Sequence, residues 1–252
     1  MIELFYLGAE AITYHNLFIF MERYFSDSFQ PQSIRNLFSK LYREGFIRKI
    51  KRKKGICFIP LKESIYQLWN PQIHSKFNMY TKKWDGKWWV LVYDIPEEKR
   101  VKRESLRRFI QDLGLGKIQK SCWVSPYDFS RRIIDFCRKE GLLEYICFYK
   151  GVFWAGKDIG KLLDAAWGIE GLFCEYRNFI KQCREKMSRV RNNSLSFKEG
   201  YSEFTKLKRT YKSLLEADPF LPRRFLMDWP RKEAENILRQ FSKLLIARGN
   251  LK

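Results

Sequence analysis

Basic side chains are concentrated between Arg35 and Lys54, where nine lysines and arginines occur with a single acidic residue, Glu44. Lysine and arginine are cationic at neutral pH and hold phosphates through charge-assisted hydrogen bonds. The whole chain carries 49 basic and 28 acidic residues, a net charge of +21. These charges favour a polyanion as the partner, and the alternative is a solvated, highly charged surface.

Asp94 is the residue that a catalytic hypothesis would choose, because it ends a hydrophobic run from Trp88 to Tyr93. A metal-dependent phosphodiesterase needs several carboxylates around one or two metal ions, whereas this segment offers one, followed by Ile95 and Pro96. We favour instead an aspartate that accepts backbone N–H bonds at the start of a helix. We therefore expect no catalytic residue, no metal site, no cofactor and no enzymatic activity.

The elements around the basic cluster follow from the spacing of apolar residues and from the turn residues between them. The pattern predicts, in order, helices over 2–11, 13–25 and 31–44, a strand over 46–50, a basic turn over 51–55 and a strand over 56–60. Three helices and a basic hairpin form the order of a winged helix-turn-helix. Short three-helix units also serve as protein-interaction modules, so that alternative remains.

In a winged helix-turn-helix, the third helix enters the major groove of double-stranded DNA and the wing lies against the phosphate backbone. Such proteins usually recognise two half-sites, so we expect a homodimer. The predicted DNA contacts are Ser33, Arg35, Asn36, Ser39, Lys40, Arg43, Arg48, Lys49, Lys51, Arg52, Lys53 and Lys54.

The segment after residue 84 predicts an α+β sandwich with its helices on one face of a sheet. The expected elements are a strand over 88–93, a helix from 97 to 113 closed by Gly114 and Gly116, a strand over 118–125, a helix from 129 to 141, and strands over 145–149 and 152–155. The edges of such a sheet are exposed, and pairing through them would give a two-fold dimer.

Helical periodicity dominates the remainder of the chain. We predict helices over 162–167, 172–190, 197–215 and 233–247, with an extended segment fixed by three prolines between Pro219 and Pro230. Aromatic residues in this part form a core or line a ligand pocket, and the sequence leaves both interpretations open.

The central segment resembles two related groups of proteins. Tyr93-Asp94-Ile95 and the later Gln-x-Ser-x-Trp are similar to the ferredoxin-like subunit of the CRISPR spacer-adaptation machinery. The pattern is more similar to the PaaX family, repressors of phenylacetate catabolism genes. The residues that match its central module are Asp94, Pro96, Arg100, Gln119, Ser121, Trp123, Val124, Ser125 and Pro126.

Two other segments extend the PaaX resemblance over nearly the whole chain. Near the N-terminus, Ser33, Arg35, Leu41 and Gly45 match, and Phe38 replaces a leucine. The C-terminal match, the most specific one, comprises Asp218, Pro219, Leu221, Pro222, Asp228, Trp229 and Pro230.

The resemblance implies a dimeric, DNA-binding transcriptional repressor that an acyl-CoA-like effector releases from its operator. It implies a winged helix-turn-helix domain over 1–70, a ferredoxin-like dimerisation module over 84–156 and a helical effector or dimer domain over 157–252. Candidate effector contacts are Arg177, Arg184, Arg209, Arg223, Arg224 and Trp229. The alternative is a metal-dependent nucleic-acid-processing or spacer-adaptation accessory protein, with Asp94 as its candidate metal ligand.

Composition and hydropathy indicate the class of protein and its compartment. Hydrophobic residues make up 45% of the chain and aromatic residues 17%, which indicates a folded protein. No apolar run approaches the roughly 20 residues of a membrane span, and we find no secretory leader, so we expect a cytoplasmic protein without a membrane partner. The six cysteines include no Cys-x-x-Cys pair, which predicts buried thiols rather than a zinc site.

Overall fold

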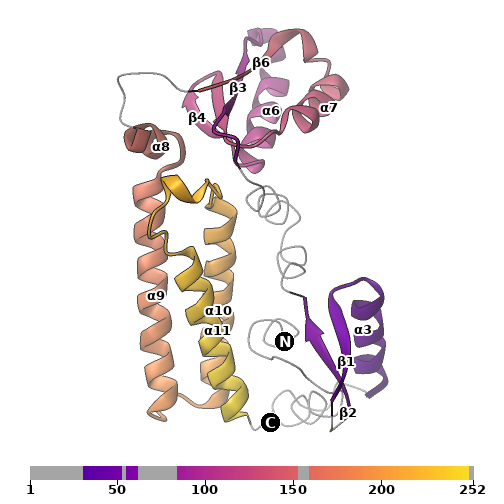
Figure 1. Cartoon of the computed structure of the whole chain (residues 1–252), viewed down its shortest axis with the longest axis vertical. Coiled ribbons are helices and arrows are strands. Elements are labelled where there is room, and N and C mark those ends of the chain that lie inside the picture. The colour runs from indigo at the N-terminus through magenta and orange to yellow at the C-terminus, as the bar shows by residue number, and fades with distance from the viewer. Residues whose placement is uncertain (1–30, 53–54, 62–83, 153–158, 250–252) are drawn as a thin grey trace. The chain divides into compact units, whose positions relative to one another are not determined.

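The computed structural model describes residues 31–52, 55–61, 84–152 and 159–249 (Figure 1). The chain divides into two compact units. One comprises Met1–Pro71, Glu175–Ser213 and Pro230–Lys252, and the other comprises Gln72–Cys174 and Leu214–Trp229. Within the described residues the fold is mixed, with seven α-helices and two small sheets. The helices predicted over 2–11 and 13–25 lie outside the described residues.

Helix α3 (Pro31–Arg43) precedes an antiparallel hairpin of β1 (Ile47–Arg52) and β2 (Gly55–Pro60). The predicted helix and hairpin are confirmed. Pairing continues to Arg52 opposite Gly55, so Lys51, Arg52 and Gly55 belong to the strands and not to the predicted turn. Lys53 and Lys54, which join the two strands, lie outside the described residues.

Aromatic packing joins α3 to the hairpin. The ring centroids of Phe38 and Phe58 lie 4.8 Å apart in an edge-to-face arrangement, a favoured aromatic geometry. Gly45 ends the helix as predicted, because its φ of +75° suits glycine and lets the N–H of Phe46 bond to the carbonyl of Leu41 at 2.8 Å. Phe38 and Leu41 on the apolar face of α3 are therefore buried, and the polar face is exposed.

The second sheet lies in the central part of the chain. Its elements are β3 (Trp88–Tyr93), η1 (Glu97–Lys99), α6 (Arg100–Asp112), β4 (Gly116–Gln119), β5 (Cys122–Ser125), α7 (Ser130–Glu140), η2 (Leu143–Tyr145) and β6 (Ile146–Gly151). The strand order is β4-β5-β3-β6, and each pair of neighbours is antiparallel. A βαββαβ chain with this order has the ferredoxin-like topology that we predicted.

The single strand predicted over 118–125 is wrong, because the chain forms two strands joined by a turn at Lys120 and Ser121. Tyr93 holds this turn. Its hydroxyl donates to the carbonyl of Lys120 at 3.1 Å, and its backbone N–H donates to the carbonyl of Ser121 at 3.1 Å. Strand β6 ends at Gly151, Val152 lies outside any strand, and residues 153–155 of the last predicted strand are outside the described residues.

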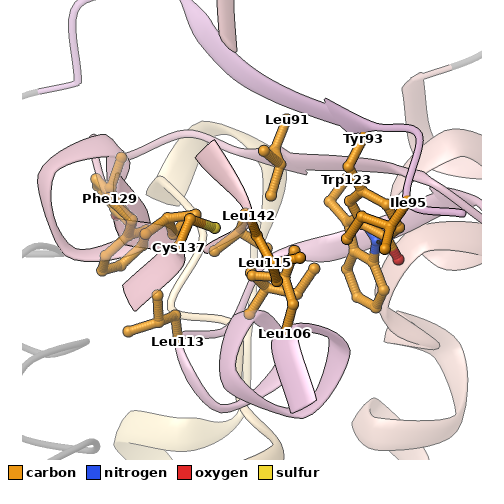
Figure 2. Close-up of a cluster of buried hydrophobic side chains, with 13 residues drawn as sticks. Leu91, Tyr93, Ile95, Leu106, Leu113, Leu115, Trp123, Phe129, Cys137 and Leu142 are labelled. Carbon is orange, nitrogen blue, oxygen red and sulfur yellow. Dashed lines mark hydrogen bonds between the residues drawn. The ribbon is translucent and has the colours of Figure 1, made fainter. Parts of the chain in front are cut away.

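One face of this sheet packs on α6 and α7 (Figure 2). Leu91 and Tyr93 point to this face and alternate with residues that point to the opposite face, as the two-residue period of a strand requires. Opposite them, Leu106 and Ile110 of α6 and Ile133 of α7 are completely buried. This cluster is the core of the ferredoxin-like module.

The opposite face is also covered, which corrects the prediction that helices lie on one face only. Trp88 of β3 and Val124 of β5 pack with Leu163 of helix α8 (Ile159–Trp167), and with Leu221 and Leu226 of the proline-rich segment. That segment contains one short turn, η3 (Arg223–Phe225), and is otherwise irregular as predicted. Its function in the fold is to cover the second face of the sheet.

Asp218 fixes the conformation of the proline-rich segment. Its side chain is completely buried and accepts hydrogen bonds from the N–H of Phe220 at 2.8 Å and from the indole of Trp229 at 2.9 Å. Phe220 has a φ of +51°, and its carbonyl accepts a bond from the hydroxyl of Tyr127 at 2.8 Å. A buried carboxyl group needs hydrogen-bond partners, and these two donors supply them to Asp218.

Helices α9 (Ile169–Arg191), α10 (Phe197–Ala217) and α11 (Arg231–Arg248) form the C-terminal helical part (Figure 1). Phe204 of α10 meets Phe241 of α11 edge to face, with ring centroids 5.8 Å apart. A Cβ at Gly200 would stand 2.9 Å from Val190 and 3.1 Å from Leu245, so glycine permits close packing there. The aromatic stripe of these helices therefore contributes to the core.

The cysteine prediction is partly wrong. Cys57, Cys137 and Cys183 are buried, whereas Cys147 and Cys174 are exposed. Among the helices that the structure describes, none is long and apolar enough to cross a membrane.

Candidate nucleic-acid interface

The polar face of α3 is the first part of the candidate interface. Ser33, Arg35 and Asn36 are exposed, and so are Ser39, Lys40 and Arg43 one and two turns later. Lys40 and Arg43 lie in the last turn, where positive charge also complements the negative end of the helix dipole. The helix thus presents every predicted polar side chain on its surface.

Two further exposed side chains lie on α3 that were not among the predicted DNA contacts. The amide of Gln32 donates to the side-chain oxygen of Asn36 at 3.0 Å, which orients the Asn36 amide. Tyr42, placed on the apolar face by its spacing, is 52% exposed. Gln32 could have been found from its four-residue spacing to Asn36, which places both side chains on one face of a helix. No feature of the sequence distinguishes Tyr42 from its buried neighbours.

The hairpin supplies the second part of the interface. Arg48, Lys49 and Lys51 of β1 are exposed. Because successive side chains of a strand point to opposite faces, Lys49 and Lys51 share one face and Arg48 lies on the other. The positions of Lys53, Lys54 and the side chain of Arg52 lie outside the described residues.

Asp94 does not cap a helix, which corrects our prediction for it. Pro96 is the residue before η1, and no side chain caps that turn. Asp94 is exposed, and its backbone N–H bonds to the carbonyl of Tyr145 at 2.9 Å. Among the described residues no three His, Cys, Asp or Glu side chains are grouped so as to hold a metal ion.

Two of the candidate effector contacts lie on one carboxylate. Arg177 and Arg184, two turns apart on α9, bond to the two oxygens of Glu233 on α11 at 2.7 and 2.8 Å. Arg209 is exposed on α10. These three arginines belong to the unit that contains the C-terminal helices.

The other three candidates belong to the unit that contains the ferredoxin-like module. Arg223 and Arg224 are exposed in η3, and the guanidinium of Arg224 lies 5.0 Å from the centroid of Trp84. Trp229 is partly buried, with its indole N–H directed at Asp218. The six candidates are therefore divided equally between the two units.

Comparison with known proteins identifies the family. The central Cas2-like domain of PaaX proteins matches residues 81–162, and the PaaX-like C-terminal domain matches residues 167–251. The chain belongs to the PaaX-type family. PaaX-type domains are regulatory rather than catalytic.

Among curated proteins, none matches the chain. Among solved structures, the uncharacterized protein Rv0674 from Mycobacterium tuberculosis is similar, with a TM-score of 0.54 and 15% sequence identity. The match covers 99% of this PaaX-type chain and 95% of that one. At this identity the match shows a similar fold.

Proposed function

We propose that the protein is a dimeric transcriptional repressor that binds double-stranded DNA through α3 and the β1–β2 hairpin. The observation that carries the proposal is the exposed basic surface of these elements, set on a helix whose other face is packed against the hairpin. Family membership supports a regulatory role. The three-domain division into 1–70, 84–156 and 157–252 belongs to the same proposal.

Arg35 and Lys40 would contact bases, while Lys49 and Lys51 would contact phosphates. Each phosphate contact releases a condensed counterion, so binding should fall steeply as salt concentration rises. The double variant Lys49→Ala/Lys51→Ala should weaken binding to every sequence and flatten the slope of log K against log salt by about one unit per contact. Arg35→Ala should instead relax sequence preference.

The test begins with selection of bound sequences from a random double-stranded DNA library. Gel-shift titrations of the selected site at several salt concentrations then compare wild type with both variants. A matched control, Lys139→Ala/Lys161→Ala, removes two exposed charges from α7 and α8. If the hairpin variant binds as well as this control at every salt concentration, the proposed phosphate contacts are wrong.

Strand β6 supports a dimer through the ferredoxin-like module. It lies at one edge of the sheet and pairs only with β3 among the described strands. Tyr149 on this strand and Val152 just beyond it are each 62% exposed, and edge strands readily pair with another chain. A Tyr149→Glu variant should weaken the dimer, whereas Val101→Glu, at an 84% exposed position on α6, should not.

Sedimentation equilibrium measures both effects. A monomeric wild type, or a dimer that Tyr149→Glu leaves unchanged, would refute assembly through this edge.

An acyl-CoA-like effector that releases the DNA completes the proposal. The many basic residues of the C-terminal helices suit a phosphorylated ligand. Such a ligand shifts the protein from its DNA-binding arrangement to a non-binding one. It can do so only by the difference between its affinities for these two arrangements. Operator release and thermal shift with phenylacetyl-CoA, other acyl-CoAs and free CoA provide the test, and no response to any of them would remove the effector alone.

A further inference from the structure

A basic hollow of about 460 Å³ lies at the end of β3, away from α3 and the hairpin in sequence. All of its lining residues belong to the ferredoxin-like module. They are Tyr93, Asp94, Ile95, Arg103, Glu104, Arg107, Lys117, Lys120 and Ser121. A volume of this size is within the range of pockets for small organic ligands.

The wall formed by the β4–β5 turn is fixed by Tyr93. Its hydroxyl donates to the carbonyl of Lys120 and accepts a bond from the indole of Trp123 at 3.3 Å. Burial raises the pKa of Tyr93, so the hydroxyl remains a donor at neutral pH. The backbone of Lys120 and Ser121 is thereby held in place before any ligand arrives, which lowers the entropic cost of binding.

Two arginines of α6 line the hollow, and they differ in their hydrogen bonds. Arg103 donates from one terminal nitrogen to the carbonyl of Ile95 at 3.2 Å and from the other to Glu97 at 2.7 Å. Arg107 uses one terminal nitrogen for both oxygens of Glu104, at 3.2 and 3.3 Å. Its Nε is buried and makes no hydrogen bond within the part of the chain that the structure describes.

Two lysines complete the positive lining. Lys117 is partly buried on β4, opposite Trp123, and Lys120 is exposed in the turn. Neither has an ion pair among the described residues. The four cations of the hollow face Asp94 and Glu104, and Glu97 also pairs with Arg103, which leaves a net charge of +1. Since Glu104 is already bound to Arg107, the uncompensated charge is concentrated on the two lysines.

We propose that this hollow binds the phosphate or diphosphate group of a small organic ligand. Lys117 and Lys120 contact the phosphate oxygens, and Arg107 contributes a fixed positive charge. Asp94 opposes the anion at the rim. This site requires neither DNA binding nor the acyl-CoA effector, and it shares no residue with the candidate contacts on the C-terminal helices.

Isothermal titration of the full chain without DNA tests the site, with inorganic pyrophosphate, ADP and coenzyme A as probes and with adenosine and pantetheine as phosphate-free comparisons. The phosphorylated probes should bind and the phosphate-free ones should not. Tighter binding of ADP or coenzyme A than of pyrophosphate would assign the site to an organic phosphate. Equal or tighter binding of pyrophosphate would contradict that assignment and indicate a site for the free anion.

Charge variants place the binding in this hollow. Lys117→Gln and Lys120→Gln should each weaken pyrophosphate binding roughly 5- to 10-fold, the effect of losing one charge-assisted contact. Lys139→Gln, at an exposed position on α7, is the matched control and should change little. Asp94→Asn should strengthen binding roughly fivefold, because it removes a repulsive charge.

Three other results would also overturn the proposal. The first is no heat of binding with any phosphorylated probe up to about 1 mM, a concentration that corresponds to very weak affinity. The second is an equal loss in the two lysine variants and the Lys139→Gln control, which would indicate a general charge effect. The third is loss of binding in Asp94→Asn together with a requirement for Mg²⁺, which would indicate a metal at Asp94 instead.

Discussion

The indole N–H of Trp229 donates a hydrogen bond of 2.9 Å to the carboxylate of Asp218, which is completely buried. Hydrogen bonds to buried charged groups contribute about 1.5–3 kcal/mol. Trp229→Phe keeps an aromatic ring but removes the donor and part of the indole's packing, so it should lower the free energy of unfolding by at least about that amount.

Urea denaturation followed by circular dichroism gives this value. Trp84→Phe is the matched control, because Trp84 packs against the same apolar cluster but its indole bonds to the uncharged carbonyl of Lys87. The control should lose less than about 1 kcal/mol. If both variants lose the same free energy of unfolding, then the hydrogen bond from Trp229 to Asp218 contributes no more than the one from Trp84 to a backbone carbonyl.

Gly116 permits the close approach of α8 to the sheet. A Cβ at this position would stand 2.5 Å from the ring of Trp167, whose indole N–H bonds to the carbonyl of Gly114 at 3.0 Å. Gly116→Ala should therefore destabilise the protein by about 1–3 kcal/mol through overpacking. Gly151→Ala, where a Cβ would meet nothing within 4 Å, should be nearly neutral.

Thermal unfolding of the two glycine variants measures the difference. If Gly116→Ala melts at the same temperature as Gly151→Ala, then Trp167 moves without cost and the packing is looser than the contact implies.

The cysteines should fall into two reactivity classes. Burial raises the pKa of Cys137 to about 11 and that of Cys183 to about 12, so almost no thiolate forms at neutral pH. Cys147 and Cys174 are exposed and should be modified first. Peptide mapping after brief iodoacetamide treatment of the native protein provides the measurement, with urea-unfolded protein as the control for intrinsic reactivity. Early labelling of Cys183 would contradict the packing of α9.

Glu203 should make stability depend on pH. Hydrogen bonds from Lys206 and Lys186 lower the pKa of Glu203 from 4.5 to about 2. Its stabilising contribution is therefore present above pH 4.5 and is lost as the pH falls towards 2, because the unfolded chain takes up the proton first. Glu203→Gln should cost about 1 kcal/mol at pH 7, since water screens the contact with Lys206, whose side chain is 68% exposed.

The difference between Glu203→Gln and wild type should shrink in denaturation curves recorded from pH 5 to pH 2.5. Glu175→Gln, at an exposed position on α9, serves as the control. A difference that stays constant over this range would show that the lysine contacts do not stabilise the carboxylate.

Local patterns were sufficient to predict α3, the hairpin and the βα units, because their apolar periodicity and glycine stops act within a few residues of each other. They failed at β4 and β5, which have four residues each and are joined at Lys120 and Ser121 without a glycine or proline signal. Tyr93, nearly thirty positions away along the chain, holds that turn. A tertiary contact of this kind leaves no trace in a short window of sequence.

The same limit applies to the candidate sites. The exposed cations of α3 and β1 could be identified because charge on a helix or strand face is a local property. The hollow at the end of β3 could not, since it combines Arg107 of α6 with Lys117 and Lys120 around a separate hairpin. The prediction that Asp94 caps a helix was wrong for a local reason. Pro96, two residues later, occupies the cap position of η1.

The cover that residues 219–229 place over Trp88 and Val124 has a consequence for synthesis on the ribosome. The last strand of the sheet, which ends at Gly151, leaves the exit tunnel about seventy residues before the segment that shields its second face, a delay of roughly 5–10 s at typical translation rates. During that interval an apolar surface containing two strands is exposed in the nascent chain. Chaperone dependence should therefore be greatest for chains arrested between these two stages, and least once Trp229 has emerged.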